Sequence, residues 1–312
     1  MSIMTDKAVV FAGQGAQFVG IGKDLAEAYP ECRDLYAKAD EVLGFPLSRI
    51  CFEGPAEALT KSNNCQPAIF VTSMACYRAL SREVPGLAFG AAAGLSLGEW
   101  SALHMAGVLS FDDVLRVLEA RGRFMQEACE EREGGMISVL GLSVDKVRDI
   151  AAAAGMEIAN LNSPEQTVLS GEKSRIPEVE KLAAAAGAKR AIPLNVAGAF
   201  HSRLMQSAAL KLEGFLKTIP FKAPAIPVVA NVTGAPHGGP DEIRQTMVQQ
   251  VTSPVQWVAS VQKMQQMGIR SYIECGPGKV LSGLIKRIDK EAGLLDTQDV
   301  ATLKKAVEAL KK

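Results

Sequence analysis

The sequence GLSLGEW at residues 94–100 determines the architecture that we expect for this chain. It contains the G-x-S-x-G pattern of a nucleophile elbow, in which a serine lies on a sharp turn between a strand and a helix. Residues 86–93 (GLAFGAAA) are apolar and small, as in a buried strand, and residues 98–107 (GEWSALHMAG) predict a helix. The flanking glycines let neighbouring backbone pass close by. An ordinary turn is the alternative interpretation, but this context favours Ser96 as a nucleophile.

The composition is typical of a soluble globular protein with a large core. The chain has 312 residues, of which 48% are hydrophobic and 22% are charged, and its 34 basic and 34 acidic side chains cancel. A zero net charge gives no reason for attraction to nucleic acid or to an anionic membrane, and no apolar run approaches the length of a bilayer span. The N-terminal residues lack the features of a signal peptide. We therefore expect a cytoplasmic protein, and a monomer.

The cysteines predict neither a metal site nor disulfide bonds. Six of them are spread along the chain without a C-x-x-C pair or another metal-binding spacing. Cys65 and Cys76 lie in an apolar helical stretch, where a small hydrophobic side chain is the simpler interpretation. We expect reduced, buried cysteines and no metal ligands.

The order of predicted elements divides the chain into two parts. Residues 7–12 predict a strand and residues 66–80 a helix, and the strand and helix of the elbow are followed by an amphipathic helix at residues 111–130. Residues 131–197 then predict the order β-α-β-β-α-β, which is the ferredoxin-like arrangement. The α/β pattern resumes with helices near 202–218, 241–251 and 256–267, and strands near 226–232 and 269–275. A Gly-Pro-Gly turn at residues 276–278 then leads into a further helix. We predict an α/β main domain of residues 1–130 and 198–312 and an inserted subdomain of residues 131–197, with a site in the cleft between them.

A serine hydroxyl needs a base to take its proton, and the chain has three histidines. His104 lies eight residues into the helix that follows Ser96, about 12 Å away at 1.5 Å per residue. His237 lies in the Gly/Pro-rich stretch APHGGP, which predicts a surface turn. His201 follows a run of small residues and precedes Ser202, a residue that favours a helix N-cap. We favour His201 as the base, with a structural or exposed histidine as the alternative.

Arg121 falls in the middle of the apolar face of the predicted helix 111–130, whereas Arg116 and Arg123 fall on the opposite side. A guanidinium keeps its proton and is unfavourable to bury unpaired, so it must meet an anion. A structural pair with a protein carboxylate and bidentate capture of a substrate carboxylate are equally compatible with this position. The apolar residues of that face are Val114, Val117, Leu118 and Met125.

The stretch FAGQGAQ at residues 11–17 follows an apolar run that predicts a strand. Its G-x-G does not make a dinucleotide motif, because Phe18 occupies the third glycine position and no acidic residue closes a second strand nearby. A tight turn at a strand end can instead present the backbone N–H of Gln14 to an oxyanion.

Together these motifs resemble the malonyl-CoA:acyl carrier protein transacylases of fatty acid synthesis, whose fold also serves as the acyltransferase domain of polyketide synthases. The resemblance runs essentially from end to end. It implies a hydrolase-like α/β domain with a parallel sheet and a ferredoxin-like insert, malonyl-CoA and acyl carrier protein as substrates, and no cofactor. The matching stretches are FAGQGAQ (11–17), QPA (66–68), GLSLGEWSAL (94–103), RGRFMQEA (121–128), NLNSPEQTVLSG (160–171), GAFHS (198–202), QQVTSPVQW (249–257) and ECGPGKVLSGL (274–284).

The resemblance also implies a Ser–His dyad rather than a triad. Ser96 would be the nucleophile and His201 the base, with a backbone carbonyl around Gln250 holding the imidazole. The backbone N–H groups of Gln14 and Leu97 would bind the oxyanion. For Arg121, the resemblance favours the malonyl carboxylate as the partner over a carboxylate of the protein.

The resemblance bears on four further positions, at two of which this chain departs from the family. Phe200, before the base, goes with malonyl rather than methylmalonyl, a discrimination of about 1–3 kcal/mol for one methyl group. Asn162 matches a position near the site. Leu95 departs from the family, which usually has a histidine before the nucleophile, and this puts local packing and access of the thiol arm in doubt. Trp100 stands where a tyrosine is commoner.

The expected reaction is a ping-pong transfer of malonyl through an ester on Ser96, which supplies fatty acid synthesis. A serine thioesterase or esterase, a trans-acting polyketide acyltransferase and a non-catalytic scaffold are the alternatives. The carrier protein is acidic, so its docking requires a local basic patch on this neutral chain. The candidates are Lys279, Lys286, Arg287 and Lys290, for which a solvated helix face is an equally good interpretation.

Overall fold

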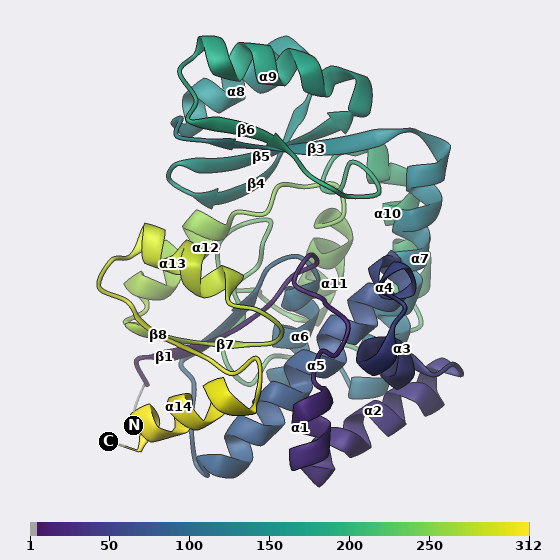
Figure 1. The fold of residues 1–312 in the computed structure, drawn as a ribbon, viewed down its shortest axis with the longest axis vertical. Coiled ribbons are helices and arrows are strands. Elements are labelled where there is room, and N and C mark those ends of the chain that lie inside the picture. Colours follow the sequence, from purple (N-terminus) through teal and green to yellow (C-terminus); the bar gives the residue numbers. More distant parts are fainter. Residues whose placement is uncertain (1–4, 312) are drawn as a thin grey trace.

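The computed structural model describes residues 5–311, which form two sheets of four strands each with helices around them (Figure 1). The first sheet is parallel throughout and has the strand order β2-β1-β7-β8. Phe11 at the end of β1 pairs with Gly94 of β2 and with Cys275 of β7, so the carboxyl ends of three strands meet at one edge. The strands are β1 (Lys7–Phe11), β2 (Ala91–Gly94), β7 (Ser271–Cys275) and β8 (Gly293–Asp296).

Both faces of this sheet are covered, as in other parallel sheets. Along β1, Val9 and Phe11 face the cluster that contains α5 and α7, whereas Ala8 and Val10 face the cluster that contains α12 and α13. Around the sheet lie α1 (Lys23–Ala28), α2 (Pro30–Leu43), α3 (Leu47–Glu53), α4 (Ala56–Thr60), α5 (Ser62–Glu83), α6 (Leu97–Met105), α7 (Phe111–Glu131), a 3-10 turn (Arg203–Met205), α10 (Gln206–Leu216), α11 (Pro240–Gln249), α12 (Trp257–Gln266), α13 (Val280–Ile288) and α14 (Val300–Leu310).

The second sheet is antiparallel, with the order β4-β5-β3-β6, and α8 and α9 cover one of its faces (Figure 1). This order and connectivity confirm the ferredoxin-like insert, and the fold class is the expected one. The extent of the insert, residues 131–197, stays our proposal. Its elements are β3 (Gly134–Leu140), α8 (Val144–Ala154), β4 (Glu157–Ser163), β5 (Gln166–Glu172), a 3-10 turn (Lys173–Arg175), α9 (Ile176–Ala185) and β6 (Arg190–Pro193).

The predicted strand at residues 226–232 is wrong. This segment forms only isolated bridges, Val228 with Ala92 and Val229 with Pro236. Pro227 has no N–H to donate to a ladder, and the chain reverses soon afterwards, where the N–H of Gly234 donates to the Ala230 carbonyl. The segment therefore lies along the edge of β2 without extending the sheet by a full strand.

The other predicted elements are present with shifted ends: β2 is shorter than the predicted strand at residues 86–93, and α5 extends the predicted helix at residues 66–80 in both directions. The sequence patterns did not predict α1 to α4 or β8. Across residues 5–311, no helix combines the length and the apolar character needed to cross a membrane. The six cysteines are free, and Cys65 and Cys76 are buried as expected.

Candidate active site

Ser96 lies on the turn between β2 and α6, with φ of 55° and ψ of −108°. A residue other than glycine rarely adopts a positive φ, and the strain is of order 1–3 kcal/mol. The glycines beside it are required by close packing, because a Cβ on Gly98 would lie 2.2 Å from the Phe11 carbonyl oxygen. A Cβ on Gly94 would lie 2.0 Å from the Gly98 carbonyl carbon. The turn thus has the strained, tightly packed geometry of a nucleophile elbow.

His201 is buried and contacts the serine, with its Nε2 2.9 Å from Ser96 Oγ. Its Nδ1 lies 2.8 Å from the Gln250 carbonyl oxygen and 3.2 Å from that of Ser253. Because these carbonyls accept the proton of Nδ1, Nε2 carries the lone pair that a base needs. Backbone carbonyls therefore orient the imidazole, in the place where a triad has a carboxylate.

Burial, and then the charge of Arg121, lower the pKa of His201 to about 4. The imidazole is therefore neutral at physiological pH and can accept the proton of Ser96.

The other two histidines lie outside this contact. His104 Nδ1 is 2.9 Å from the Leu109 carbonyl oxygen. The prediction that His237 lies in a surface turn is wrong, because its side chain is buried and its Nε2 lies 2.7 Å from Glu99 Oε1. The Gly/Pro-rich segment folds inward, where the N–H of His237 donates to the Val228 carbonyl.

Arg121 on α7 is 1% exposed, whereas Arg116 and Arg123 on the same helix are about half exposed. Its Nη1 donates to Gln66 Oε1 at 2.7 Å, and its Nη2 donates to Ser96 Oγ at 3.2 Å and to Gln250 Oε1 at 3.1 Å. None of the ion pairs formed within residues 5–311 includes Arg121. The guanidinium therefore touches the serine and neutral amides, and the interpretation as a structural pair with a carboxylate is not supported.

The charge of Arg121 persists in this environment. Burial lowers the pKa of Arg121 to about 10, and the negative charge of Glu99 opposes that shift. A pKa of this size leaves the guanidinium positive at physiological pH. Its Nε is buried and makes no hydrogen bond to any other described residue.

The turn at residues 13–15 lies against the elbow. A Cβ on Gly13 would lie 2.7 Å from the Leu95 carbonyl oxygen, so the backbone before Gln14 approaches the serine turn closely. Leu97 begins α6, where the first N–H groups of a helix lack intrahelical partners. Neither the Gln14 nor the Leu97 N–H donates a hydrogen bond to another of residues 5–311. Both N–H groups therefore have no partner in the described part of the chain, as an oxyanion site requires.

Phe200 and Asn162 are both buried or partly buried, but neither makes a side-chain hydrogen bond to Ser96, His201 or Arg121 within residues 5–311. Phe200 is 7% exposed and packs in the main cluster, next in the chain to the base. Asn162 is on β4, and its side-chain oxygen is buried without a partner in the described part of the chain. No hydrogen bond joins it to Ser96 or Arg121 among residues 5–311.

Several residues that touch this site were assigned no role from the sequence. Gln66 entered the sequence analysis only as part of the matching stretch QPA. A glutamine within an apolar helix could have indicated a buried polar contact. Asn231 accepts the Ser96 N–H at 2.6 Å and donates to the Gly94 carbonyl at 2.7 Å, and Glu99 is fully buried behind the elbow. Ser253 contributes only a carbonyl. No pattern in the sequence brings these long-range partners together.

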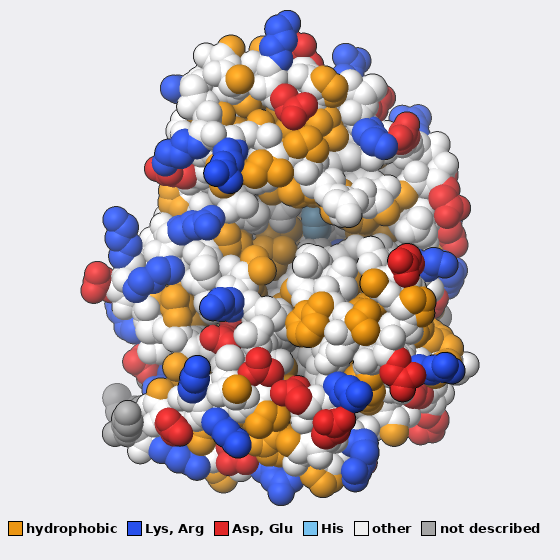
Figure 2. Space-filling view, viewed as in Figure 1, with side chains coloured by type: hydrophobic (Ala, Val, Ile, Leu, Met, Phe, Trp, Pro, Cys, Tyr) orange, Lys and Arg blue, Asp and Glu red, His pale blue; other side chains and the backbone are white. Residues whose placement is uncertain are grey.

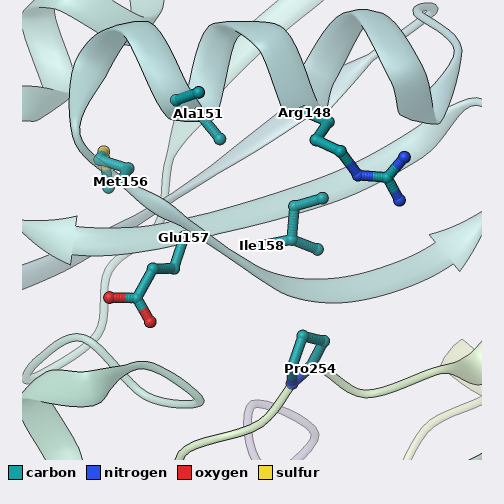
Figure 3. A pocket seen from close by; sticks show the side chains of 7 residues that line it. Arg148, Ala151, Met156, Glu157, Ile158 and Pro254 are labelled. Atoms are coloured by element: carbon teal, nitrogen blue, oxygen red, sulfur yellow. The ribbon is translucent and has the colours of Figure 1, made fainter.

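The molecular surface is hollowed between the insert and the main domain, and a histidine side chain is visible on the floor of the hollow (Figure 2). A separate pocket lies between α8, β4 and Pro254 (Figure 3). Its charged residues are already paired, Arg148 with Asp145 and Glu157 with Arg203. In the described part of the chain, no group of three or more His, Cys, Asp or Glu side chains could hold a metal ion.

A serine on a strand–helix elbow, in contact with a histidine and close to free backbone N–H groups, is the arrangement of an α/β serine enzyme. Comparison with known proteins narrows this class. The chain belongs to the acyl transferase domain family, which matches residues 8–311.

Its relatives include named transacylases. The chain is 40% identical over 313 residues to the malonyl CoA-acyl carrier protein transacylase of Bacillus subtilis, covering 99% of this chain and 98% of that protein. It is 44% identical over 289 residues to the Escherichia coli protein of the same name, covering 91% and 93%. A solved complex of a type II PKS acyl-carrier protein with its malonyl-transacylase matches with a TM-score of 0.93 at 39% identity, covering 98% of this chain and 100% of that one.

Proposed function

We propose that this protein transfers malonyl from malonyl-CoA to the phosphopantetheine thiol of acyl carrier protein, through a malonyl ester on Ser96. The contact between Arg121 and Ser96 carries this proposal. The guanidinium is buried, charged and 3.2 Å from the nucleophile, and its hydrogen-bond partners among the described residues are all neutral. An acyl group that ends in a carboxylate places its carbonyl at the serine and its negative charge at the guanidinium. The names of the relatives support this assignment.

In the first half-reaction, His201 Nε2 takes the proton of Ser96 as Oγ attacks the thioester carbonyl. The oxyanion is held by the backbone N–H groups of Gln14 and Leu97. When the C–S bond breaks, the sulfur of CoA leaves with the proton from His201. Arg121 then holds the carboxylate of the malonyl ester.

In the second half-reaction, the thiol of the carrier protein gives its proton to His201 and its sulfur attacks the ester carbonyl. The same N–H groups hold the second oxyanion. The C–O bond to Ser96 breaks, and Oγ recovers its proton from His201. Because Arg121 fixes the far end of the acyl group, the ester carbonyl stays oriented toward the incoming thiol. Phe200 selects malonyl over methylmalonyl by limiting the space beside the acyl chain, and Asn162 lines the approach to the site.

The basic residues on and beside α13 form the docking surface for the acidic carrier protein. Lys279, Lys286, Arg287 and Lys290 are all exposed, and basic side chains gather over this part of the surface (Figure 2). Arg287 also donates to Gln166 Oε1 of the insert at 2.9 Å. The solved complex of a carrier protein with its transacylase supports a carrier protein as partner. A solvated helix face stays the alternative for this patch.

We also propose a cofactor requirement, a cellular location and an oligomeric state for this protein. Side chains and backbone groups carry out each step, so we propose no cofactor beyond the two substrates. The free cysteines favour a cytoplasmic location, and we propose a monomer that supplies fatty acid synthesis. A trans-acting polyketide acyltransferase would perform the same chemistry on another carrier protein.

The mass of the intact protein after mixing with malonyl-CoA tests the function. We expect a covalent malonyl adduct, release of one equivalent of CoA, and loss of the adduct on addition of the carrier protein. Ser96→Ala should form no adduct and should exchange no malonyl. Continuous release of CoA without the carrier protein would instead indicate a thioesterase, and the absence of any adduct on the wild-type protein would indicate a non-catalytic scaffold.

A further inference from the structure

A buried carboxylate lies directly behind the elbow and has no part in the proposed reaction. Glu99 is in the first turn of α6, three residues after Ser96, and it is fully buried. Its Oε1 lies 2.7 Å from His237 Nε2. Its Oε2 accepts the side-chain N–H of Gln250 at 2.6 Å and the backbone N–H of Asn231 at 3.1 Å. The Glu99 carboxylate therefore joins His237, Gln250 and Asn231.

Gln250 connects this carboxylate to the reacting groups. Its Nε2 donates to Glu99 and to the Ser96 carbonyl at 3.0 Å, and its Oε1 accepts from Arg121 at 3.1 Å. Its backbone carbonyl lies 2.8 Å from His201 Nδ1. If the amide were reversed, its NH₂ would face the guanidinium and its oxygen would face the carboxylate, and both contacts would be repulsive. The negative charge of Glu99 therefore fixes the orientation in which Gln250 offers an acceptor to Arg121.

Asn231 connects the same carboxylate to the strained turn. Its backbone N–H donates to Glu99, and its side chain bridges the two sides of the elbow, accepting from the Ser96 N–H and donating to the Gly94 carbonyl. Ser96 holds a positive φ only because its surroundings require it. Glu99 thus anchors the residue that keeps the nucleophile in this conformation.

His237 is the third residue that contacts the Glu99 carboxylate. Its side chain is 1% exposed, and its Nδ1 makes no hydrogen bond to any described residue. Its only hydrogen bond from the ring is to Glu99, so the loop that carries it closes over the carboxylate.

We propose that Glu99 is a positioning residue for acyl transfer, which holds Arg121 and Ser96 in place through Gln250 and Asn231. The proposal rests on the proposed function, because it presumes that Ser96 and Arg121 handle the acyl group. A displacement of about 1 Å at reacting groups lowers a rate by about 100-fold. We therefore expect Glu99→Leu, which removes the acceptors, to lower the acylation rate constant with malonyl-CoA about 100-fold while KM changes less than about threefold.

Two further variants separate positioning from folding. Glu99→Gln keeps an oxygen that accepts from Gln250 and Asn231. Its NH₂ group can donate to Nε2 of His237 when that imidazole carries its proton on Nδ1. This variant should therefore retain a rate within about tenfold of the wild type. Glu274→Leu is the matched control, since Glu274 is also fully buried and accepts two backbone N–H groups at the start of α13. It should lower the midpoint of thermal unfolding without changing the acylation rate of the folded protein. An equal loss of rate in Glu99→Leu and Glu274→Leu would overturn the proposal.

A double-mutant cycle tests whether Glu99 acts through Gln250. Gln250→Ala removes the amide but keeps the backbone carbonyl, and the double variant should lose less than the product of the two single losses. A loss equal to that product would overturn the proposed connection.

All variants are also labelled with a fluorophosphonate, which reacts with an activated serine whatever its acyl substrate. If the wild-type protein is labelled but takes up no malonyl, the proposed function fails. The labelling rates of the Glu99 variants then still test its positioning role, which an unchanged rate in Glu99→Leu would overturn.

Discussion

Replacing Arg121 with alanine should remove most of the preference for malonyl. The guanidinium is buried, and within residues 5–311 it donates only to Gln66, Gln250 and Ser96. The malonyl carboxylate would therefore add a direct partner with a full negative charge. Removing one member of a buried ion pair costs about 3–5 kcal/mol, because the other charge stays buried and unpaired. At tenfold per 1.4 kcal/mol, kcat/KM for malonyl-CoA should fall roughly 100- to 4,000-fold.

The acetyl group provides the internal control for this prediction. It has no carboxylate, so Arg121→Ala should change acylation by acetyl-CoA only through the lost contact with Ser96 and the lost effect of the guanidinium on the pKa of His201. The lost contact is worth less than a charged pair. Acylation rates with each thioester can be followed by rapid quenching and intact-protein mass. Arg116→Ala is the matched variant on the same helix, since its side chain is 52% exposed and pairs only with Asp113. It should leave both rates unchanged.

Equal losses for malonyl and acetyl would refute the reasoning. They would mean that the guanidinium supports the nucleophile or the fold rather than the substrate carboxylate. The thermal unfolding midpoint separates these two outcomes, because a general loss of structure lowers it together with both rates, whereas damage confined to Ser96 lowers the rates alone.

Three further predictions follow from the same geometry. Burial lowers the pKa of His201 to about 4 in the folded protein, whereas an unfolded histidine has a pKa near 6.5. Between these two pH values the unfolded chain binds a proton at this histidine and the folded protein does not. Stability should therefore fall as the pH drops from about 6.5 to about 4, by up to about 3 kcal/mol in urea titrations, and His201→Gln should lack this component. Phe200→Ser should improve methylmalonyl relative to malonyl transfer by about 10- to 200-fold, measured as a ratio of kcat/KM values. Charge reversal at Lys286 and Arg287 should raise KM for the carrier protein and leave acylation by malonyl-CoA unchanged; an equal fall in acylation would contradict the proposed docking surface.

The elements that carry their own periodicity could be predicted from the sequence. The ferredoxin-like order at residues 134–193 is visible because each strand and helix there has its own pattern and is followed by a turn. The strand β8 (Gly293–Asp296) was not predicted, because four residues are too few to show an alternation and it pairs only with β7. Residues 226–232 look like a strand by composition, but the missing N–H of Pro227 and the turn at Gly234 limit them to isolated bridges.

The residues of the candidate site likewise include some that the sequence predicts and some that it does not. Helical phase places Arg121 on the buried face, and the elbow motif and the small number of histidines single out Ser96 and His201 for the contact that the structure shows. Asn231 and Glu99 could not be found from local sequence. Asn231 lies 135 residues from the serine that it holds, and an acidic residue in the first turn of a helix is ordinarily an exposed partner of the helix dipole. Only the folded chain shows that Glu99 is fully buried.

Leu95 stands where the family usually has a histidine, and its surroundings indicate what this change affects. Its side chain packs with the apolar cluster on one face of the parallel sheet, and its Cδ2 would lie 3.0 Å from a Cβ on Gly13. Position 95 therefore supports the turn that carries the N–H of Gln14. Ser96 and His201 contact each other at 2.9 Å without help from this side chain. In the proposed reaction the proton passes directly between those two residues, so a leucine at position 95 leaves that path intact. It acts instead on the packing beneath the turn that we propose to bind the oxyanion.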